Sequence, residues 1–586
     1  MLKNYLKTAL RLMSRHKAYT LINIAGLAIG IAVCLFILIW VRNETGYDRF
    51  HSNINELYRV TQEQHYTDGT VFPIATGPTE IGPALKKDYL EVVEFTRLRI
   101  VNDLLMSVDE NSFYGDGILL ADPSFLTVFS YPLLRGNPAT AVNDLHSMVI
   151  SEQAAAKYFG GEDPIGKTIQ VENRIDFIIT GIMKDVPANS HLQFDFIGNF
   201  EILTKTFNWS TGWFNNSYYT YIQLQKGADV EKLESEVFSY LKKIRPESRT
   251  KFFLQPVKDI HLRSHYAIDL YGQTQDRSQY VYIFTAVAIF VLLIACINFM
   301  NLATARAGLR GKEISMRKVV GARRSEIIRQ FFGESVLFAF IACLLAAGAV
   351  WLLMPRFNQL VGKSIPRISV LEPEILIFIA GIALASGILS GVYPALFLSS
   401  FQPVSVLKGK TLSRGGSPAF RKALVVFQFS LSTIFIAGAL IISTQLDFMR
   451  NRDLGFNKEA VIHFRIRGDL RRNYQAFKSD MLKLPGIKSM TRSSDLPTYT
   501  VHSTSGFQWE GMTADDNILI HNYSVDEDFT DTLGLKISEG RDFSPERSAD
   551  KNGYIVNQAA VRHMSMDDPI GKTIQLWNKP GPILGV

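Results

Sequence analysis

Five uncharged apolar stretches constrain the fold of this 586-residue chain more than any other feature. Each is about as long as the ~20 apolar residues that a helix needs to cross the hydrocarbon core of a bilayer. One such stretch could be a buried core helix, but five of full length indicate an integral membrane protein. The predicted spans are residues 18–41, 280–305, 335–355, 375–399 and 423–445.

The basic residues in the short segments predict the orientation of these spans. Lysine and arginine are frequent before the first span, between the second and third, and between the fourth and fifth, and scarce between the third and fourth. Short basic segments stay on the cytoplasmic side, so the N-terminus is predicted to be inside. Residues 42–279 and 446–586 then form two extracytoplasmic domains. Topology thus accounts for the net charge of +7, and no nucleic-acid partner is needed.

Three shorter segments complete the predicted inner side. Residues 1–17 have an amphipathic helical pattern that suits a helix lying on membrane lipids, with its basic face at anionic headgroups. Docking of this leader on the spans is the alternative. Residues 306–334 form a charged elbow between the second and third spans, and residues 400–422 form a linker before the fifth.

The residues that commonly carry chemistry do not cluster in this sequence. All three cysteines lie inside predicted spans, so the external domains are expected to have no disulfide. The eleven histidines are scattered and do not approach Cys, Asp or Glu at metal-ligand spacing. We therefore predict no catalytic site, no metal site and no cofactor.

One motif argues against that prediction. Residues Gly161–Thr168, GEDPIGKT, match the phosphate-binding pattern G-x-x-x-x-G-K-[ST]. A working phosphate loop needs a strand before it and a helix after it, so that the helix N-terminus faces the anion. Here a helical pattern precedes Gly160, and an alternating hairpin pattern follows from Thr168, with residues 172–174 as its turn. We interpret the match as false and expect no nucleotide site.

An internal repeat supports this interpretation. Residues 568–575 read DPIGKTIQ, identical to residues 163–170 and displaced by 405 positions, but Met566 replaces the first glycine of the pattern. Asp122-x-x-Phe125 with Gly136 recurs as Asp526-x-x-Phe529 with Gly540. A tandem duplication of a span–domain–spans unit is the simplest explanation. By the pattern of the first copy the chain ends within a strand, so we expect it to lack part of the second domain and three further spans.

The elbow and two pairs of glycines are the most informative parts of the membrane region. Lys312–Val320 reads as a short helix stopped by Gly321, and a second helix is expected to start near Ser325 and continue into the third span. This elbow would give a soluble partner a lever on the spans, or it could serve only as a positive-inside anchor. The glycines allow close helix approach in the first and fourth spans: Gly26, Gly30, Gly387 and Gly391.

These residues carry a family resemblance. The segments LKNYLKTALRLMSRHKAYTLINIAGLAIGIA, KEISMRKVVGARRSEIIRQFFGES and GVYPALFLSSFQPVSVLKGK resemble MacB/FtsX-type permeases of ABC transporters, and DPIGKTI with GIMKDVP resembles their periplasmic core domain. The duplication resembles the fused eight-span members. The resemblance implies an α+β membrane protein: a transmembrane helical bundle with two mixed α/β extracytoplasmic domains, in the bacterial inner membrane.

The resemblance also implies a mechanism. A separate cytoplasmic ABC ATPase would push on the elbow, and the spans would relay this motion to the periplasmic domains. Export of peptides, drugs or lipoproteins, with a periplasmic adaptor or substrate protein as a further partner, would follow. The alternative is a signalling protein that senses an external ligand or controls cell-wall hydrolases. The residues expected at the ATPase contact are Glu313, Arg317, Lys318, Gly321, Arg323 and Arg324.

Overall fold

The structure is a computed structural model that describes residue 13 and residues 17–109, 111–115, 117–270, 272–305, 314–399, 418–498, 502–513, 516, 518–577 and 579–586. The predicted amphipathic helix and the 400–422 linker lie almost wholly outside these residues. The chain divides into two compact units, and each is described by itself. A helical unit comprises residues 1–47 and 277–451, and a sheet unit comprises residues 48–276 and 452–586.

Five helices of the helical unit are long and apolar enough to cross a membrane, among the described residues. Each predicted apolar stretch lies within one of them, but the helices extend further because polar residues continue the helix at one or both ends. In particular, residues 324–334, which we assigned to the elbow, belong to the third helix. The helices are α2 (Lys17–Thr45), α9 (Ser278–Ala305), α11 (Arg324–Val361), α12 (Pro373–Ser399) and α14 (Pro418–Asn451).

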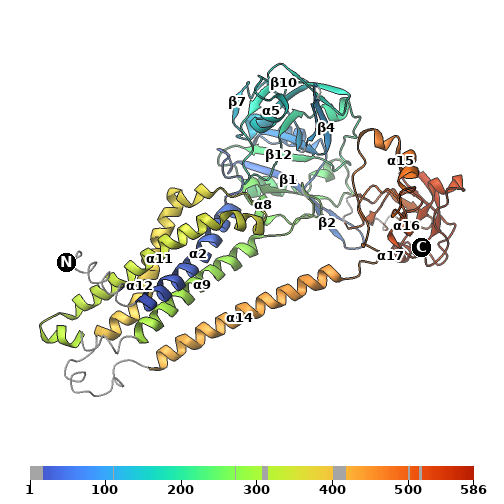
Figure 1. The fold of residues 1–586 in the computed structure, drawn as a ribbon. Coiled ribbons are helices and arrows are strands. Elements are labelled where there is room, and N and C mark those ends of the chain that lie inside the picture. Colours follow the sequence, from blue (N-terminus) through green and yellow to red (C-terminus); the bar gives the residue numbers. More distant parts are fainter. Residues whose placement is uncertain are drawn as a thin grey trace. The chain divides into compact units, whose positions relative to one another are not determined.

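Four of these helices pack around one apolar core (Figure 1). Leu27, Ile31 and Leu35 of α2 are almost fully buried in it, against apolar side chains of α9, α11 and α12. A short 3₁₀ helix, η3 (Arg367–Leu371), connects α11 to α12. The fifth helix, α14, contacts α9, where the rings of Phe290 and Phe435 lie 6.5 Å apart.

The sheet unit contains a 13-stranded mixed sheet built entirely from residues 57–256. Its strand order is β13-β1-β12-β3-β6-β11-β8-β10-β9-β4-β5, with β2 beside β1 and β7 beside β10. Most neighbours are antiparallel, but β10–β8 and β11–β6 are parallel. The strands are β1 (Leu57–His65), β2 (Val71–Ile74), β3 (Val92–Val101), β4 (Leu104–Val108), β5 (Asn111–Gly115), β6 (Ile118–Ala121), β7 (Leu133–Arg135), β8 (Ser147–Ser151), β9 (Thr168–Val171), β10 (Ile175–Met183), β11 (Phe196–Asn199), β12 (Tyr219–Leu224) and β13 (Lys251–Pro256).

Short helices cover this sheet. The helix predicted before Gly160 is present as α5 (Glu152–Phe159), and α7 (Val230–Val237) is followed by a 3₁₀ turn, Tyr240–Lys243. The Ser151 hydroxyl accepts a hydrogen bond from the Ala154 N–H and so caps α5, as expected of serine at this position. The helices are α3 (Ile81–Asp88), α4 (Phe125–Val128), α5 (Glu152–Phe159), α6 (Ile202–Lys205), α7 (Val230–Val237), η2 (Val257–Asp259) and α8 (Ile260–Arg263).

The second part of the sheet unit repeats elements of the first on a smaller scale. The strands β18 and β19 form the counterpart of the β9–β10 hairpin, and β17 runs parallel to β19 as β8 does to β10. The elements are η4 (Gly468–Arg471), α15 (Tyr474–Met481), β14 (Ser503–Thr504), β15 (Phe507–Trp509), β16 (Ile520–His521), α16 (Phe529–Leu533), η5 (Ser548–Asn552), β17 (Tyr554–Ile555), α17 (Gln558–His563), β18 (Thr573–Leu576) and β19 (Lys579–Gly585).

Candidate functional site

The segment that matches the phosphate-binding pattern is a turn between α5 and the β9–β10 hairpin. The Lys167 N–H donates to the Pro164 carbonyl at 3.0 Å, and the Gly166 N–H donates to the Ile179 carbonyl at 2.8 Å. Gly166 has φ +80°, the left-handed conformation that glycine adopts most easily in a turn. These backbone N–H groups therefore serve the turn. The order is helix, turn, strand, as the sequence predicts.

The repeated copy has the same geometry. The Lys572 N–H donates to the Pro569 carbonyl at 3.2 Å, the Gly571 N–H donates to the Ile583 carbonyl at 2.8 Å, and Gly571 has φ +82°. The match at residues 161–168 thus reflects a turn that both copies need to enter a hairpin. The repeat therefore preserves the turn.

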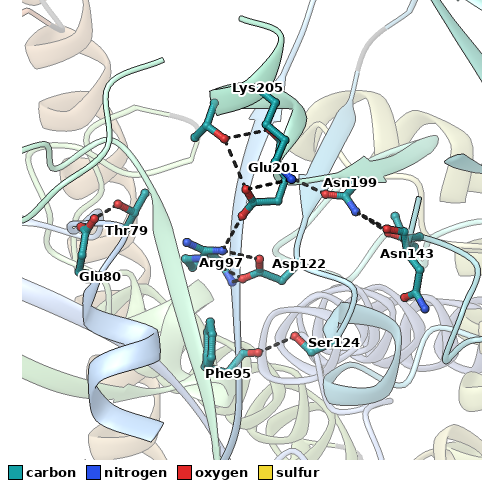
Figure 2. Close-up of polar contacts among 12 residues, drawn as sticks. Thr79, Glu80, Phe95, Arg97, Asp122, Ser124, Asn143, Asn199, Glu201 and Lys205 are labelled. Atoms are coloured by element: carbon teal, nitrogen blue, oxygen red, sulfur yellow. Dashed lines mark hydrogen bonds and ion pairs between the residues drawn. The ribbon is translucent and has the colours of Figure 1, made fainter. Parts of the chain in front are cut away.

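The second repeated motif builds a polar cluster in the first domain (Figure 2). The Arg97 guanidinium donates to both Asp122 carboxylate oxygens, at 2.9 and 2.8 Å, and reaches Glu201 at 3.3 Å. Burial alone would lower the pKa of Arg97, but hydrogen bonds to Asp122 outweigh it and raise that pKa. In the second copy Asp526 accepts from the Lys478 ammonium at 3.0 Å. Because the Asp carboxylate meets an internal cation in both copies, we interpret the motif as structural.

The structure describes the elbow from residue 314 onward, and Glu313 lies outside the described residues. Residues 314–319 are helical, Gly321 has φ +107°, and α11 begins at Arg324. The Arg323 N–H donates to the Glu326 carboxylate at 3.0 Å and so helps to cap α11. Ile314 packs with Ile327 and Phe331 of α11 and with Ala395 of α12. Over the described residues the predicted short helix is present at 314–319, the chain turns at Gly321, and the second helix starts at Arg324, one residue before the expected Ser325.

Three of the predicted contact residues hold the elbow against the helical bundle. The Arg317 guanidinium donates to the Gln330 side chain at 2.7 Å, and Gln330 donates to the buried Glu334 carboxylate at 3.0 Å. The Lys318 ammonium donates to the Ser399 carbonyl at 2.6 Å, and Arg324 donates to the Ser399 hydroxyl at 3.3 Å. Burial, together with nearby Arg324, lowers the pKa of Lys318. These side chains thus connect the elbow to α11 and to the end of α12.

Unlike Ile314, three apolar side chains of the elbow lie on its surface. Met316, Val319 and Val320 are exposed, and Val320 is 85% exposed. Sequence reasoning concentrated on charge and missed these three residues. The signal was present as apolar residues interspersed among basic ones, M-R-K-V-V, in the segment between the second and third apolar helices.

The four glycines predicted at helix contacts lie at interfaces of different tightness. A methyl group added to Gly30 would lie 2.6 Å from the Ala295 Cβ of α9, and one added to Gly387 would lie 2.8 Å from the Val336 Cα of α11. Gly391 would meet the Ser335 hydroxyl at 3.0 Å, and Gly26 would meet Asn298 at 3.4 Å. All of these contacts are within the chain.

No metal site accompanies these features in the part of the chain that the structure describes, because no three His, Cys, Asp or Glu side chains there are arranged to hold an ion. The features that the described residues do offer are a charged and apolar elbow, close helix contacts, and folded domains built on a repeated hairpin.

Comparison with known proteins identifies two family domains. Residues 20–239 match the MacB-like periplasmic core domain, and residues 285–403 match the FtsX-like permease C-terminal domain. Among solved structures, a domain of a putative permease protein from Porphyromonas gingivalis is 22% identical over 35% of this chain and 91% of its own, with a TM-score of 0.32. The periplasmic region of MacB from Actinobacillus actinomycetemcomitans is 15% identical over 36% of this chain and 94% of its own, with a TM-score of 0.28.

Curated relatives match parts of the chain. "Macrolide export ATP-binding/permease protein MacB" of Neisseria meningitidis serogroup A is 26% identical over 307 residues, 50% of this chain and 43% of the relative. "Pyoverdine export ATP-binding/permease protein PvdT" of Pseudomonas syringae pv. tomato is 24% identical over 51% of this chain and 43% of the relative. The chain thus spans less than half the length of these relatives. The two matched domains lie in the predicted order, and together they support the identification of this chain as a MacB/FtsX-type ABC permease.

Proposed function

We propose that this chain is a membrane subunit that relays ATP-driven motion of a separate cytoplasmic ABC ATPase to its extracytoplasmic domains. In this proposal the chain performs no chemistry itself. The ATPase binds the elbow, the helices carry the displacement across the bilayer, and the external domains act on a molecule on the far side of the inner membrane. Relatives named for macrolide and pyoverdine export support an export role.

The continuity of α11 is the observation that carries the proposal. The helix runs unbroken from Arg324, directly after the elbow, to Val361. At ~1.5 Å per residue its 38 residues span ~57 Å, more than the ~30 Å of a hydrocarbon core. A displacement applied at the elbow therefore acts on one end of a single rod. Arg317 joins the elbow to that rod through Gln330, and Lys318 joins it to the end of α12 at Ser399. Arg324, the first residue of the rod, donates to the same Ser399, so the elbow is held to the bundle.

Met316, Val319 and Val320 supply the surface that the ATPase would contact. Exposed apolar side chains on a rigid short helix, with exposed arginines at 323 and 329 beside them, suit an apolar groove with an acidic rim. Buried apolar anchors contribute most of the affinity in such contacts, while peripheral charges mainly affect the rate of association.

The test is association of the full chain with a co-expressed cytoplasmic ABC ATPase from the same organism. We expect Val320→Asp to weaken ATPase binding at least about tenfold, because the carboxylate would be desolvated in the contact. Leu90→Asp is the matched control, since Leu90 is an equally exposed apolar residue, at 89%, on the first external domain. Binding to the Leu90→Asp chain should stay within about twofold of the unsubstituted chain.

Wild-type ATPase binding by Val320→Asp would contradict the elbow as the contact. If the unsubstituted chain bound no ATPase, and an external ligand instead changed the labelling of the elbow, the chain would be a signalling protein. If the unsubstituted chain does bind the ATPase, measurement of ATP hydrolysis by the complex in the presence of candidate macrolides, pyoverdine, peptides and lipoproteins would identify the exported molecule.

A further inference from the structure

A buried ion pair lies at the end of α11 opposite the elbow. The Lys363 ammonium approaches the Glu44 carboxylate of α2 at 2.8 Å, and only 21% and 5% of the two side chains are exposed. The ammonium also donates to the Tyr47 hydroxyl at 2.8 Å and lies 4.8 Å from the centre of its ring. Burial alone would lower the pKa of Lys363, but hydrogen bonds to Glu44 and Tyr47 outweigh it and raise that pKa. Separation of such a pair would leave a buried, uncompensated charge.

Further contacts join the last turns of α2 to the start of α12 and to α11. Arg42 of α2 pairs with Glu372 and, at 2.7 Å, with Glu374, which flank the start of α12. One turn or more earlier, the rings of Phe36 and Phe357 stack with centres 4.7 Å apart. We refer to Arg42, Glu44, Tyr47, Lys363, Glu372 and Glu374 as the Lys363 cluster.

The backbone around Lys363 is itself fixed by α11. Gly362 ends the helix with φ +63°, and the N–H groups of Gly362 and Lys363 both donate to the Asn358 carbonyl. The Asn358 side-chain amide donates to the Ile365 carbonyl at 2.8 Å. The backbone of Lys363 therefore moves together with the end of α11, although Pro355 removes one backbone hydrogen bond from the last turns of that helix. The stacking of Phe357 on Phe36 holds those turns against α2.

The residue after Tyr47 is fixed just as firmly within the sheet unit. Asp48 is buried with φ +58°, a conformation that a residue other than glycine keeps only when its surroundings enforce it. Its N–H donates to the Asn189 carbonyl at 2.9 Å, and its carboxylate accepts from the His191 N–H at 2.9 Å and the Ser190 hydroxyl at 3.2 Å. Two consecutive residues are thus anchored, Tyr47 to Lys363 and Asp48 to the first domain.

We propose that the Lys363 cluster is the joint that transfers displacement of α11 to the first external domain. The proposal rests on the relay function above and names the residues at its far end. Since the cluster joins the end of α11 to the last turns of α2, these helices move together there. Because a single peptide bond separates Tyr47 from the anchored Asp48, little of that displacement is lost before it reaches the domain.

Hydrogen exchange of the full chain in lipid nanodiscs tests the joint without an ATPase. We expect Lys363→Met to raise the exchange rates of the amides at 45–49 by about tenfold, because the ion pair between Lys363 and the buried Glu44 and the hydrogen bond to Tyr47 are lost. Tyr47→Phe, which removes one hydrogen bond, should give a smaller increase. The charge swap Glu44→Lys with Lys363→Glu should restore slow exchange. Glu374→Gln is the matched control, since it removes an exposed negative charge from the same cluster and should change these rates by less than about twofold.

A second measurement uses the complex with the ATPase. In the unsubstituted complex, ATP and magnesium should change the exchange rates of residues 48–56, and Lys363→Met should reduce this change at least about threefold while ATPase binding and hydrolysis remain. Unchanged exchange at 45–49 in Lys363→Met, or a full ATP response at 48–56, would overturn the proposal. If the chain carrying both Glu44→Lys and Lys363→Glu does not fold, the two single variants decide the question. Exchange rates at amides 45–49 that are the same in Tyr47→Phe, Lys363→Met and the unsubstituted chain would overturn the proposal. Absence of ATPase binding in the unsubstituted chain would count against the relay function, while the first measurement would still decide the joint.

Discussion

At the scale of single residues, burial determines the charge of Asp48 and His51, which lie where the first domain begins after α2. His51 is almost fully buried, and its Nδ1 atom accepts a hydrogen bond from the Ser130 N–H at 3.1 Å. Burial and the nearby His191 lower the pKa of His51 to about 4, although Asp48 opposes this shift. Asp48 also has a lowered pKa: burial would raise it, but interactions with His191 outweigh burial. His51 is thus neutral and Asp48 ionised at neutral pH.

This arrangement predicts that acid destabilises the first external domain. Between the ordinary histidine pKa of 6.5 and the folded value of about 4, the unfolded chain binds more protons than the folded chain. The stability contributed by neutral His51 is therefore complete above the ordinary pKa and is lost as pH falls toward about 4. The loss is about 3 kcal/mol at the lower end. Urea unfolding of the full chain, followed by hydrogen exchange in β1 and β12 between about pH 7 and 4.5, would measure it.

Replacement of His51 provides the control for this pH dependence. His51→Gln should flatten stability between about pH 6.5 and 4.5, since the glutamine carbonyl can accept from Ser130 but does not titrate there. His265→Gln is the comparison, because His265 is exposed. An equally steep dependence in the His51→Gln chain would show that another group is responsible.

At the scale of elements, Gly387 determines how closely α12 approaches α11. We expect Gly387→Ala to destabilise the helical unit by about 1–3 kcal/mol, because the new methyl group would clash with the Val336 backbone, which has no side-chain freedom to yield. Gly381 lies on the same helix, and a methyl group there meets nothing within 4 Å. Gly381→Ala should therefore be neutral or stabilise by up to about 1 kcal/mol. Thermal unfolding in detergent would compare the two, and equal midpoints would show that α12 and α11 pack differently.

Local patterns in the sequence predict several helices and strands, but they do not predict which strands pair with one another. The alternation of Ile175, Phe177 and Ile179 predicts β10, and the beginning of α5 is evident from Ser151. The sheet order is a different matter, because β1 pairs with β12 and β13, which lie more than 150 residues away. No periodicity within a strand contains that information.

The elbow shows the same limit for a functional site. Its helix, stop and restart follow from Gly321 and the surrounding residues, and the structure confirms them. Its charges suggested a contact surface, yet Arg317 and Lys318 donate to Gln330 and Ser399, one of them on α12, about 80 residues away. Whether a charged side chain points to a partner or to its own chain depends on packing. Composition alone does not determine this.

At the scale of the whole molecule, the two copies of the sequence repeat also share backbone structure. Gly136 has φ +100°, and an added methyl group would meet the backbone at Thr180 and Gly181. Gly540 has φ +78° and forms a bridge to Gly585, the counterpart of Gly181. The same backbone approach therefore recurs in both copies and requires glycine on at least one side. A duplicated domain is expected on the same side of the membrane as the original, because each copy follows a span with a basic inner flank.

The last prediction concerns the side of the membrane on which each part lies. The proposed relay requires the elbow on the cytoplasmic face and both domains on the opposite face. Single cysteines at exposed Lys226 and Lys551 should react with a membrane-impermeant maleimide in intact spheroplasts, and one at Ser325 should react only after permeabilisation. Background labelling should be low because the three native cysteines are buried. Labelling of Lys226→Cys and Ser325→Cys from the same side would leave no bilayer for α11 to cross, and the relay would fail. Labelling of Lys551→Cys only after permeabilisation would instead leave the first domain in place and refute the duplicated topology.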